Sequence, residues 1–368
     1  MDNITKIASD ARFRLARSLM TSTGGGGDSA NNSGSSDSLE GAIDIFASLL
    51  EKARNTYGET SLAAALCYYE YGNALFRAVV RRQPLDGVNE KDDNEEEDKK
   101  PAAKPSASAA AAVARKRSLD DDDTKAGNKR AKIGNDDDEE DESDDDDINL
   151  ALEMLTTSFS IFDWHSSDDD DTNTKPDEEG KQYSLTQIPR VLSTIGDIHS
   201  HLGKFGDAVD AYCRALTYRE NAWEERRQNA KGESLSVDDL KCQRLLVTTY
   251  ALIAEALLAC KEGEDVVCEN DDEDTEEKDD TNSATAKKDG KNKEEKVIVA
   301  AKDRIDFADS HYNTAREKLQ DIVYQMGKLA AEKVDLGDEK KDIGYLVMML
   351  VGIGNTLEPL KTKRSGSL

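Results

Sequence analysis

Histidine, glycine and aspartate are the residues of this chain whose spacing could support chemistry. The four histidines include a His199-Ser-His201 pair, but His199 falls where a helical repeat carries an aromatic residue, and His311 adjoins Tyr312 in a helical pattern. Core or surface roles are favoured over metal binding. The glycine run 24–27 lacks the Gly-Lys-Ser/Thr of a phosphate-binding loop, and the aspartate runs lack the Gly and Glu of a calcium loop. We predict no catalytic residues, no metal site and no cofactor, so the protein is not expected to be an enzyme.

The carboxylates are instead suited to neutralising a basic partner. Between residues 136 and 147, eleven of twelve side chains are acidic. An extended chain advances about 3.3–3.6 Å per residue and a DNA strand presents a phosphate about every 3.4 Å, so this run approximates the charge density of a nucleic acid strand. A solubilising spacer is the alternative interpretation. The predicted acidic tract consists of Asp136, Asp137, Asp138, Glu139, Glu140, Asp141, Glu142, Asp144, Asp145, Asp146 and Asp147.

Two basic clusters lie within the same acidic segment, eleven residues apart. This spacing is typical of a bipartite nuclear localisation signal, which an import adaptor binds in two acidic pockets. A chance pair of basic islands is the alternative. We predict a nuclear protein that shuttles through the cytoplasm; whether Ser118 or Ser143, each close to an aspartate run, is phosphorylated stays open. The clusters are Arg115, Lys116 and Arg117, and Lys129, Arg130 and Lys132.

The charge is concentrated in three segments. The 368 residues carry a net charge of −28, of which −26 falls in 86–148, 168–181 and 262–296. Direct binding to nucleic acid is not predicted, because it requires a basic face. No apolar run approaches the roughly 20 residues of a membrane span, so no membrane partner is predicted either. Since aromatic residues are only 5% of the chain, the acidic segments are expected to be disordered.

Outside those segments the pattern is helical, and no strand-like alternation is evident. In 191–220, Gly196 falls on a first helix, and Ala208 and Tyr212 fall on a second helix beyond a "GKFGD" turn. This is the spacing of a tetratricopeptide repeat, in which a small residue allows two antiparallel helices to approach and a large one fills the gap beside it. The same template places Gly72 on a first helix, and it places Ala308 and Tyr312 on a second.

We therefore predict an all-α tetratricopeptide-repeat superhelix of about four repeats with C-terminal capping helices and long disordered acidic insertions. The first helix is expected at 4–20 and the last at 341–357, ending before Pro359. Residues 1–85 are predicted to form repeat one, with a Gly/Ser insert at 21–37, and the first helix of repeat two. After a disordered acidic insert at 86–147, residues 148–261 are predicted to form the second helix of repeat two, repeat three and the first helix of repeat four, with an acidic insert at 168–181. A second disordered insert at 262–296 precedes the second helix of repeat four and the capping helix in 297–358, and a disordered tail follows at 359–368.

This arrangement resembles the NASP-like histone chaperones, whose tetratricopeptide repeats are interrupted and whose second repeat carries a long acidic insertion. The matching strings are "YGETSLAAALCYYEYGNALFRA" (57–78), "INLALEMLTTSFSIF" (148–162), "STIGDIHSHLGKFGDAVDAYCRAL" (193–216) and "RLLVTTYALIAEALL" (244–258). The insert at 262–296 and the Gly/Ser insert at 21–37 depart from the family pattern. The resemblance implies a nuclear protein that binds the histone pair of the nucleosome's central tetramer, shields it during import and delivers it for chromatin assembly, with other histone chaperones as possible partners.

In such repeats the concave face comes from the first helices, and this predicts a histone-binding groove lined by Tyr69, Asn73, Phe76, Asp197, Ser200 and Glu255. Two other functions stay open. A co-chaperone that captures the acidic C-terminal peptide of a heat-shock protein needs Lys and Arg in the groove, and these positions lack them. A general import chaperone for basic cargo fits every electrostatic argument equally well. Stoichiometry, oligomeric state, the histone segment that is gripped, and deposition versus storage stay open.

Overall fold

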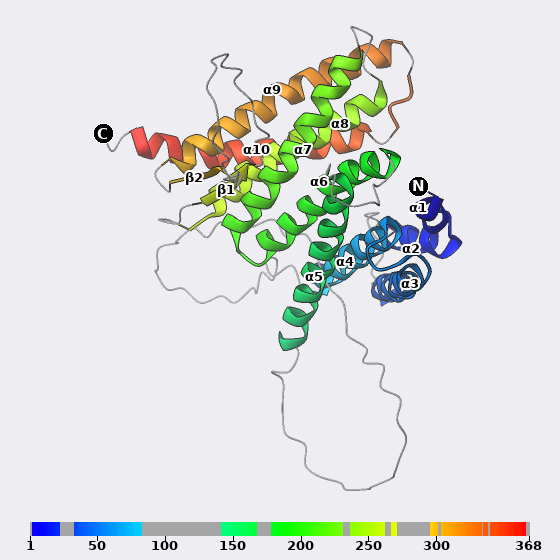
Figure 1. Ribbon diagram of the computed structural model, residues 1–368. Coiled ribbons are helices and arrows are strands. Elements are labelled where there is room, and N and C mark those ends of the chain that lie inside the picture. Colours follow the sequence, from blue (N-terminus) through cyan, green and yellow to red (C-terminus); the bar gives the residue numbers. More distant parts are fainter. Residues whose placement is uncertain are drawn as a thin grey trace, which may run out of the picture. The chain divides into compact units, whose positions relative to one another are not determined.

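The structure of the protein is a computed structural model (Figure 1). It describes residues 2–22, 33–82, 141–167, 178–230, 236–261, 266–270, 295–300, 303–332, 334–337 and 339–365. Within these ranges the chain forms ten helices and one pair of strands. The chain divides into two compact units, Met1–Gln187 and Ile188–Leu368. This boundary falls inside one helix and was not predicted.

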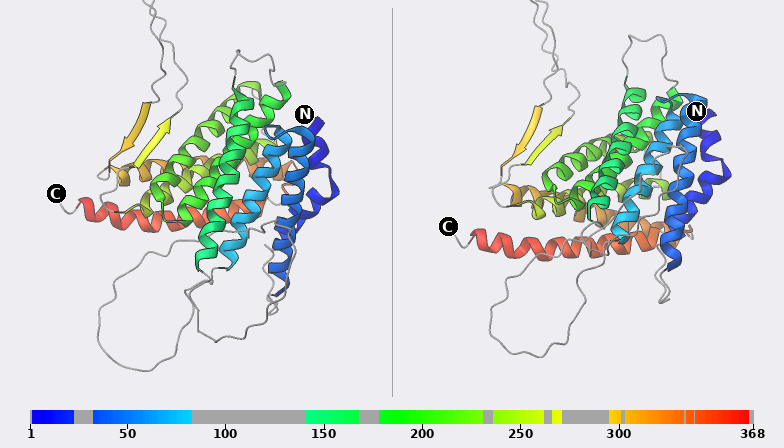
Figure 2. Two further views of the ribbon diagram at one scale, coloured as in Figure 1. Left: turned by 60° about the horizontal axis from the view of Figure 1, so that its bottom comes forward. Right: turned by 90° about the horizontal axis from the view of Figure 1, so that it is seen from below.

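The first unit is built from consecutive helices that pack against one another. α2 packs on α3, α3 on α4 and α4 on α5, and Figure 2 shows the last three side by side. Because neighbouring helices in the chain are also neighbours in space, each hairpin buries its own apolar face. The helices are α1 (Asp2–Ala8), α2 (Ala11–Ser22), α3 (Ser33–Tyr57), α4 (Leu62–Arg82), α5 (Asp141–Ser166) and the start of α6 (Glu178–His201).

α4 and α5 form an antiparallel pair although 58 residues separate them in the sequence. A Cβ atom on Gly72 would lie 3.0 Å from Leu155 Cγ and 3.1 Å from the Ala151 carbonyl oxygen, so the glycine allows the two backbones to approach. One end of the pair is fixed by the buried Ser158 hydroxyl, which donates to the Ala65 carbonyl oxygen over 2.9 Å. The two helices expected on either side of the long acidic insert therefore pack together.

The predicted first helix at 4–20 is two helices, broken at Asp10. The Asp10 carboxylate accepts a hydrogen bond from the Arg12 amide over 2.9 Å and so caps the start of α2. It also pairs with Lys52 Nζ on α3 at 3.0 Å. These contacts, with the Lys52 hydrogen bond the largest, hold the pKa of Asp10 well below its usual value. The break thus gives α2 a capped start that is tied to α3.

The second unit repeats this arrangement. α7 packs on α8 and α8 on α9, while α10 lies against both α8 and α9 (Figure 1). Its described elements after α6 are α7 (Phe205–Ala230), α8 (Val237–Ala259), β1 (Val266–Asn270), β2 (Glu295–Val299), α9 (Arg304–Ala331) and α10 (Glu339–Ser365).

α8 and α9 are also antiparallel and also lie on either side of an acidic segment. Gln243 Nε2 donates to Asp321 Oδ2 over 2.8 Å near one end of the pair. Towards the other end the rings of Tyr250 and His311 lie 5.6 Å apart. Arg304 donates to the Lys261 carbonyl oxygen over 2.7 Å, just beyond the end of α8. The prediction of an all-α fold is therefore confirmed in its coarse form, as helices packed in chain order.

A short antiparallel sheet corrects the statement that the sequence has no strand-like stretch. β1 pairs with β2 in the register Val266 to Val299 and Asn270 to Glu295, so residues at both ends of the expected insert 262–296 form strands. Val266 and Val299 are buried, and β1 packs against α7. The β-branched residues of "VVCEN" and "KVIV" favour strands, and they gain burial by pairing on the helical layer.

Three helices begin inside segments that were expected to be inserts. α3 starts at Ser33, inside 21–37; α5 starts at Asp141, inside 86–147; and α6 starts at Glu178, inside 168–181. Acidic residues are favoured in a first helical turn because they interact with the positive end of the helix dipole, and this explains the early starts of α5 and α6. α3 is anchored by buried Leu39 and Ala42, and its helix extends outward from them.

The last helix does not end before Pro359, and 359–368 is not entirely a disordered tail. α10 continues through Pro359 to Ser365. Proline removes one backbone donor and costs helix stability, but tertiary contacts on both sides offset that cost. Leu357 is buried, and Lys361 Nζ pairs with Asp309 Oδ1 on α9 at 3.1 Å.

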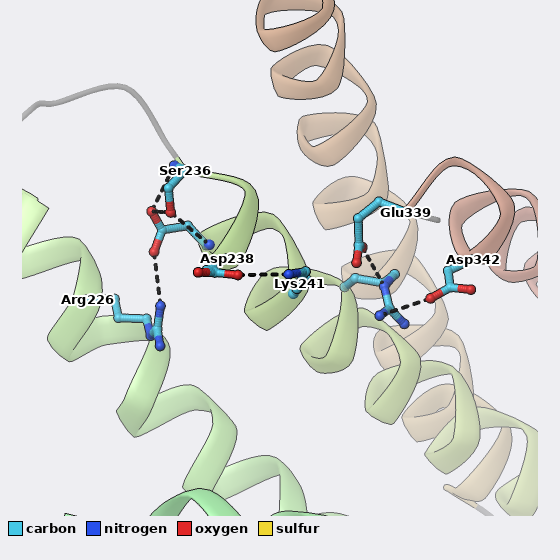
Figure 3. A network of polar contacts seen from close by, with 8 residues as sticks. Arg226, Ser236, Asp238, Lys241, Glu339 and Asp342 are labelled. Atoms are coloured by element: carbon cyan, nitrogen blue, oxygen red, sulfur yellow. Dashed lines mark hydrogen bonds and ion pairs between the residues drawn. The ribbon is translucent and has the colours of Figure 1, made fainter. Parts of the chain in front are cut away.

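A polar network fixes α8 between its neighbours (Figure 3). Ser236 and Asp239 form a capping box at the start of α8, and Asp239 also pairs with Arg226 of α7 at 3.3 Å. Further along α8, Arg244 Nε contacts Glu339 Oε2 at 2.9 Å, and its terminal nitrogen contacts Asp342 at 3.1 Å. Arg244 thus binds the acidic first turn of α10.

We expect Arg244→Met to destabilise the docking of α10, because it leaves the largely buried Glu339 carboxylate without its cation. The expected loss is about 2–3 kcal/mol in the free energy of unfolding, measured by urea denaturation, with faster amide exchange along α10. Lys241→Met is the matched control, since its pair with Asp238 is exposed and should not contribute measurably. Equal effects of the two substitutions would contradict this role for Arg244.

Candidate binding site

The candidate site lies in the second unit and is built around Tyr212 of α7. The Tyr212 ring rests directly on the backbone of α6, because a Cβ atom on Gly196 would lie only 2.5 Å from Tyr212 Cε1. Tyr212 is 2% exposed, and Ala208, one turn earlier on α7, is fully buried. The predicted small-large pair is therefore present, and it fixes where the Tyr212 hydroxyl lies.

Two predicted groove residues meet that hydroxyl. The Tyr212 phenol donates to Asp197 Oδ1 over 2.7 Å, and Ser200 Oγ lies 3.5 Å from the phenol oxygen. Burial, followed by the negative charge of Asp197, raises the pKa of Tyr212 well above its usual value. The phenol therefore stays protonated and remains a donor, which holds the Asp197 carboxylate in place.

Glu255 of α8 is the third predicted residue in this unit. It is half-buried, and burial raises the pKa of its carboxyl group. Its charge also contributes to the raised pKa of Tyr212, so the two groups lie within electrostatic reach. No described residue forms a hydrogen bond or ion pair with the Glu255 carboxylate. Asp197 and Ser200 thus meet the Tyr212 hydroxyl, with Glu255 within electrostatic reach of it, and we call these four residues the Tyr212 site.

The chemistry of the Tyr212 site is that of a receptor for a cation. Two partly desolvated carboxylates interact with a lysine or arginine side chain more strongly than exposed carboxylates do. Bringing a cation to Glu255 would also relieve the burial penalty that raises its pKa.

The predicted groove residues of the first unit do not form an open surface. Tyr69 and Phe76 are 6% and 3% exposed, and only Asn73 is half-buried. α4 is buried almost all round because it contacts α3, α5 and α1. The assignment of Tyr69 and Phe76 to a binding face is therefore wrong. Most positions of α4, including all of Ala63 to Tyr69, are apolar or aromatic, and this composition signals the burial in the sequence.

The other residues predicted to define the repeat are found at helix contacts. Ala308 of α9 is fully buried. The Tyr312 hydroxyl oxygen lies 2.7 Å from where a Cβ atom on Gly354 of α10 would be, so this tyrosine packs against a glycine as Tyr212 does. The expected helix spacing is present at these positions, with Gly354 as a partner that was not predicted.

The acidic tract is only partly described. Residues 136–140, both basic clusters and Ser118 lie outside the described residues, while Asp141 to Asp147 begin α5. Asp147 is buried, and its carboxylate lies 3.7 Å from Arg82 of α4. The last part of the tract is therefore helical, and Asp147 is a packing residue within it.

Arg219 is a structural residue that was not predicted. Arg219 of α7 donates to the carbonyl oxygens of Pro189 on α6 and Leu245 on α8, over 3.3 and 3.4 Å, and to the Thr249 hydroxyl. It bridges three helices. A single arginine in a helical pattern does not predict this role, because the two carbonyl oxygens that Arg219 reaches belong to other helices and come within its reach only when the helices pack.

In the described part of the chain, no three His, Cys, Asp or Glu residues are grouped to hold a metal ion. Burial is the main cause that lowers the pKa values of His199, His201 and His311.

Two described helices, α8 and α10, are long and apolar enough to cross a membrane by length and composition alone. Of the 18-residue apolar window in each helix, 50% is buried within the protein in α8 and 28% in α10.

Comparison with known proteins adds no relative: neither a protein-family model nor a curated protein matches the sequence.

Proposed function

We propose that this protein is a nuclear histone chaperone that binds the histone pair of the nucleosome's central tetramer, shields it during import and delivers it for chromatin assembly. The observation that carries the proposal is the pairing of helices across the acidic segments, α4 with α5 and α8 with α9. Because the helices pack on both sides of each segment, the carboxylates are added to a folded helical array without interrupting it.

The division of charge supports the same role. Nearly all of the net charge of −28 lies in three segments, and the rest of the chain is close to neutral. Dense negative charge attracts a basic protein and accelerates the encounter, but it does not select among basic proteins. In this proposal the folded helices select the partner and the acidic segments neutralise it.

We interpret the helices as about four tetratricopeptide repeats with α10 as a cap, as in the NASP-like histone chaperones. The contacts of Tyr212 with Gly196 and of Gly72 with Leu155 support this interpretation, because both are close helix approaches at the positions that define the repeat. The concave face would then include the Tyr212 site. There, Asp197 and Glu255 would present their carboxylates to a basic side chain of the histone pair.

The co-chaperone alternative is less well supported by these residues. Capture of an acidic C-terminal peptide requires cations in the groove, whereas the Tyr212 site presents two carboxylates. A general import chaperone for basic cargo remains a competing proposal, since the same carboxylates would suit it. Only competition between cargoes separates these two functions.

The test is a set of titrations of the full chain with four ligands at about 0.3 M salt, where exposed charge interactions are largely screened. The ligands are the histone pair of the central tetramer, the other core histone pair, a basic ribosomal protein and a heat-shock C-terminal peptide. We expect the first to bind at least about tenfold more tightly than any other. Equal binding of all basic ligands would favour the general chaperone, and binding of the peptide alone would refute the proposal.

A further inference from the structure

One face of α10 carries large apolar side chains that the second unit does not cover. Tyr345, Met348 and Val351 are 73%, 70% and 52% exposed, while Leu346 and Leu350 on the opposite face are buried. At about 100° per residue, the three exposed side chains lie within about 60° of the direction of Met348. They form a continuous stripe, and an apolar stripe of this kind marks an interaction surface.

Two glycines flank the same stripe, and the packing of the unit does not require either of them. A Cβ atom on Gly344 or Gly352 would meet nothing within 4 Å. Gly354 differs, because a Cβ atom there would meet Tyr312. Glycine destabilises a helix interior relative to alanine, and no contact within the unit explains this cost at Gly344 and Gly352. Two such glycines on one exposed face indicate that another molecule packs closely against the helix there.

The residues of the stripe are arranged symmetrically about Met348. Gly344 and Gly352 lie four residues to either side of it, and Tyr345 and Val351 lie three residues to either side. When two copies of a helix pair in antiparallel fashion about a twofold axis at position 348, residues equally far before and after 348 lie at the same height. Tyr345 and Gly352 lie on the same side of the Met348 direction, at about 60° and 40°, and the twofold axis places Tyr345 of one copy within one residue, about 1.5 Å along the helix, of the height of Gly352 of the other. Val351 and Gly344 are related in the same way on the other side. Each large side chain meets a glycine, as an isologous interface requires.

We propose that this protein self-associates through α10, with two copies of the helix antiparallel and Met348 at the twofold axis. The symmetric part of the stripe spans nine residues, about 14 Å of helix, so the interface is small and the dimer is weak and concentration-dependent. Because each chain carries a net charge of −28, salt should strengthen the dimer by screening repulsion. The proposal is independent of histone binding, which salt should weaken.

Sedimentation velocity of the full chain tests this proposal over a concentration series up to about 100 µM, in the range where weak dimers form. We expect a monomer–dimer equilibrium that shifts to dimer as NaCl is raised to about 0.5 M. Met348→Glu and Met348→Lys should each weaken the dimer about tenfold or more, because two like charges then meet at the axis. An equimolar mixture of the two variants should restore it as a heterodimer.

Two further variants separate this interface from general effects on folding. Gly352→Val should also abolish the dimer, since it fills the space that Tyr345 of the other copy occupies, while the melting temperature stays unchanged. Leu15→Glu is the control, because Leu15 is an equally exposed apolar residue, 52% exposed, on α2. It should leave the dimer unchanged.

A chain that stays monomeric at every concentration and salt would overturn the proposal. So would a dimer that Met348→Glu leaves intact, or a Glu/Lys mixture that associates no better than either variant alone. Flotation with phosphatidylcholine vesicles tests the competing use of the stripe. Binding of a monomeric chain to these vesicles, lost in Met348→Glu, would assign α10 to a lipid surface and overturn self-association.

Discussion

Replacing Gly196 with valine should lower the free energy of unfolding by about 3 kcal/mol, since overpacking a rigid contact typically costs this much. Even the Cβ atom would lie 2.5 Å from Tyr212 Cε1 and 2.7 Å from Cδ1. The ring cannot move away easily, because Tyr212 is 2% exposed and its hydroxyl donates a hydrogen bond to the Asp197 carboxylate. Urea denaturation of the full chain measures the loss, with the transition followed by circular dichroism.

Gly352→Val is the matched control for this substitution. Both glycines lie inside helices, but a Cβ atom on Gly352 meets no other atom within 4 Å. Its stability should therefore change by less than about 0.5 kcal/mol at a concentration where the chain is monomeric. If Gly196→Val were equally harmless, the close contact between α6 and α7, and with it the assignment of a tetratricopeptide-like repeat, would be wrong.

The second large effect is expected on binding rather than on stability. The double substitution Asp197→Asn and Glu255→Gln should weaken binding of the histone pair about 30- to 100-fold, the range for removing partly buried charges from an interface. The amide that replaces the Asp197 carboxylate retains an oxygen that can accept a hydrogen bond from the Tyr212 phenol. The melting temperature should therefore stay close to that of the wild type, and the loss would be one of recognition.

Glu225→Gln is the control for this charge change, since Glu225 is exposed on α7. It should alter affinity less than about twofold, because exposed charges contribute little at moderate salt. Titration calorimetry at about 0.3 M salt compares the variants. Unchanged affinity of the double variant would show that the Tyr212 site does not contact the partner, whatever the acidic segments contribute.

The sequence predicts the parts of this fold that depend on local spacing. Gly196 and Tyr212 are found in contact, and Gly72 packs on α5, because a small residue opposite a large one has few other uses in a helical hairpin. The helical pattern also identifies α4 and α5 as partners despite the 58 residues between them. A long insertion between two helices does not remove these spacing patterns, because the residues that form them lie within the helices.

The features that the sequence did not predict depend on tertiary contacts. Pro359 is a local stop signal, but Lys361 and buried Leu357 keep α10 helical past it. Tyr69 and Phe76 match groove positions of the repeat, yet three helices pack around α4 and bury them. In each case contacts with residues far away in the sequence outweighed the local signal.

The candidate site shows the same division between local spacing and tertiary contacts. Asp197, Ser200 and Glu255 could be predicted because they follow from the positions of first helices. The donor that holds Asp197, the Tyr212 hydroxyl, could not, since tyrosine at this position is expected for packing alone. Arg219 and Arg244 were missed for a similar reason, because their partners lie on other helices.

The central claim is that the folded helices select a histone pair, with the acidic segments as auxiliaries. It is tested most directly by purifying the full chain from its own cells and identifying what remains bound after a wash at about 0.3 M salt. The Asp197→Asn/Glu255→Gln variant is purified in parallel. We predict that mass spectrometry finds the two histones of the central tetramer with the wild type and a strong depletion of both with the variant. Recovery of a heat-shock protein or of mixed ribosomal proteins in their place, or of histones equally with both chains, would contradict the claim.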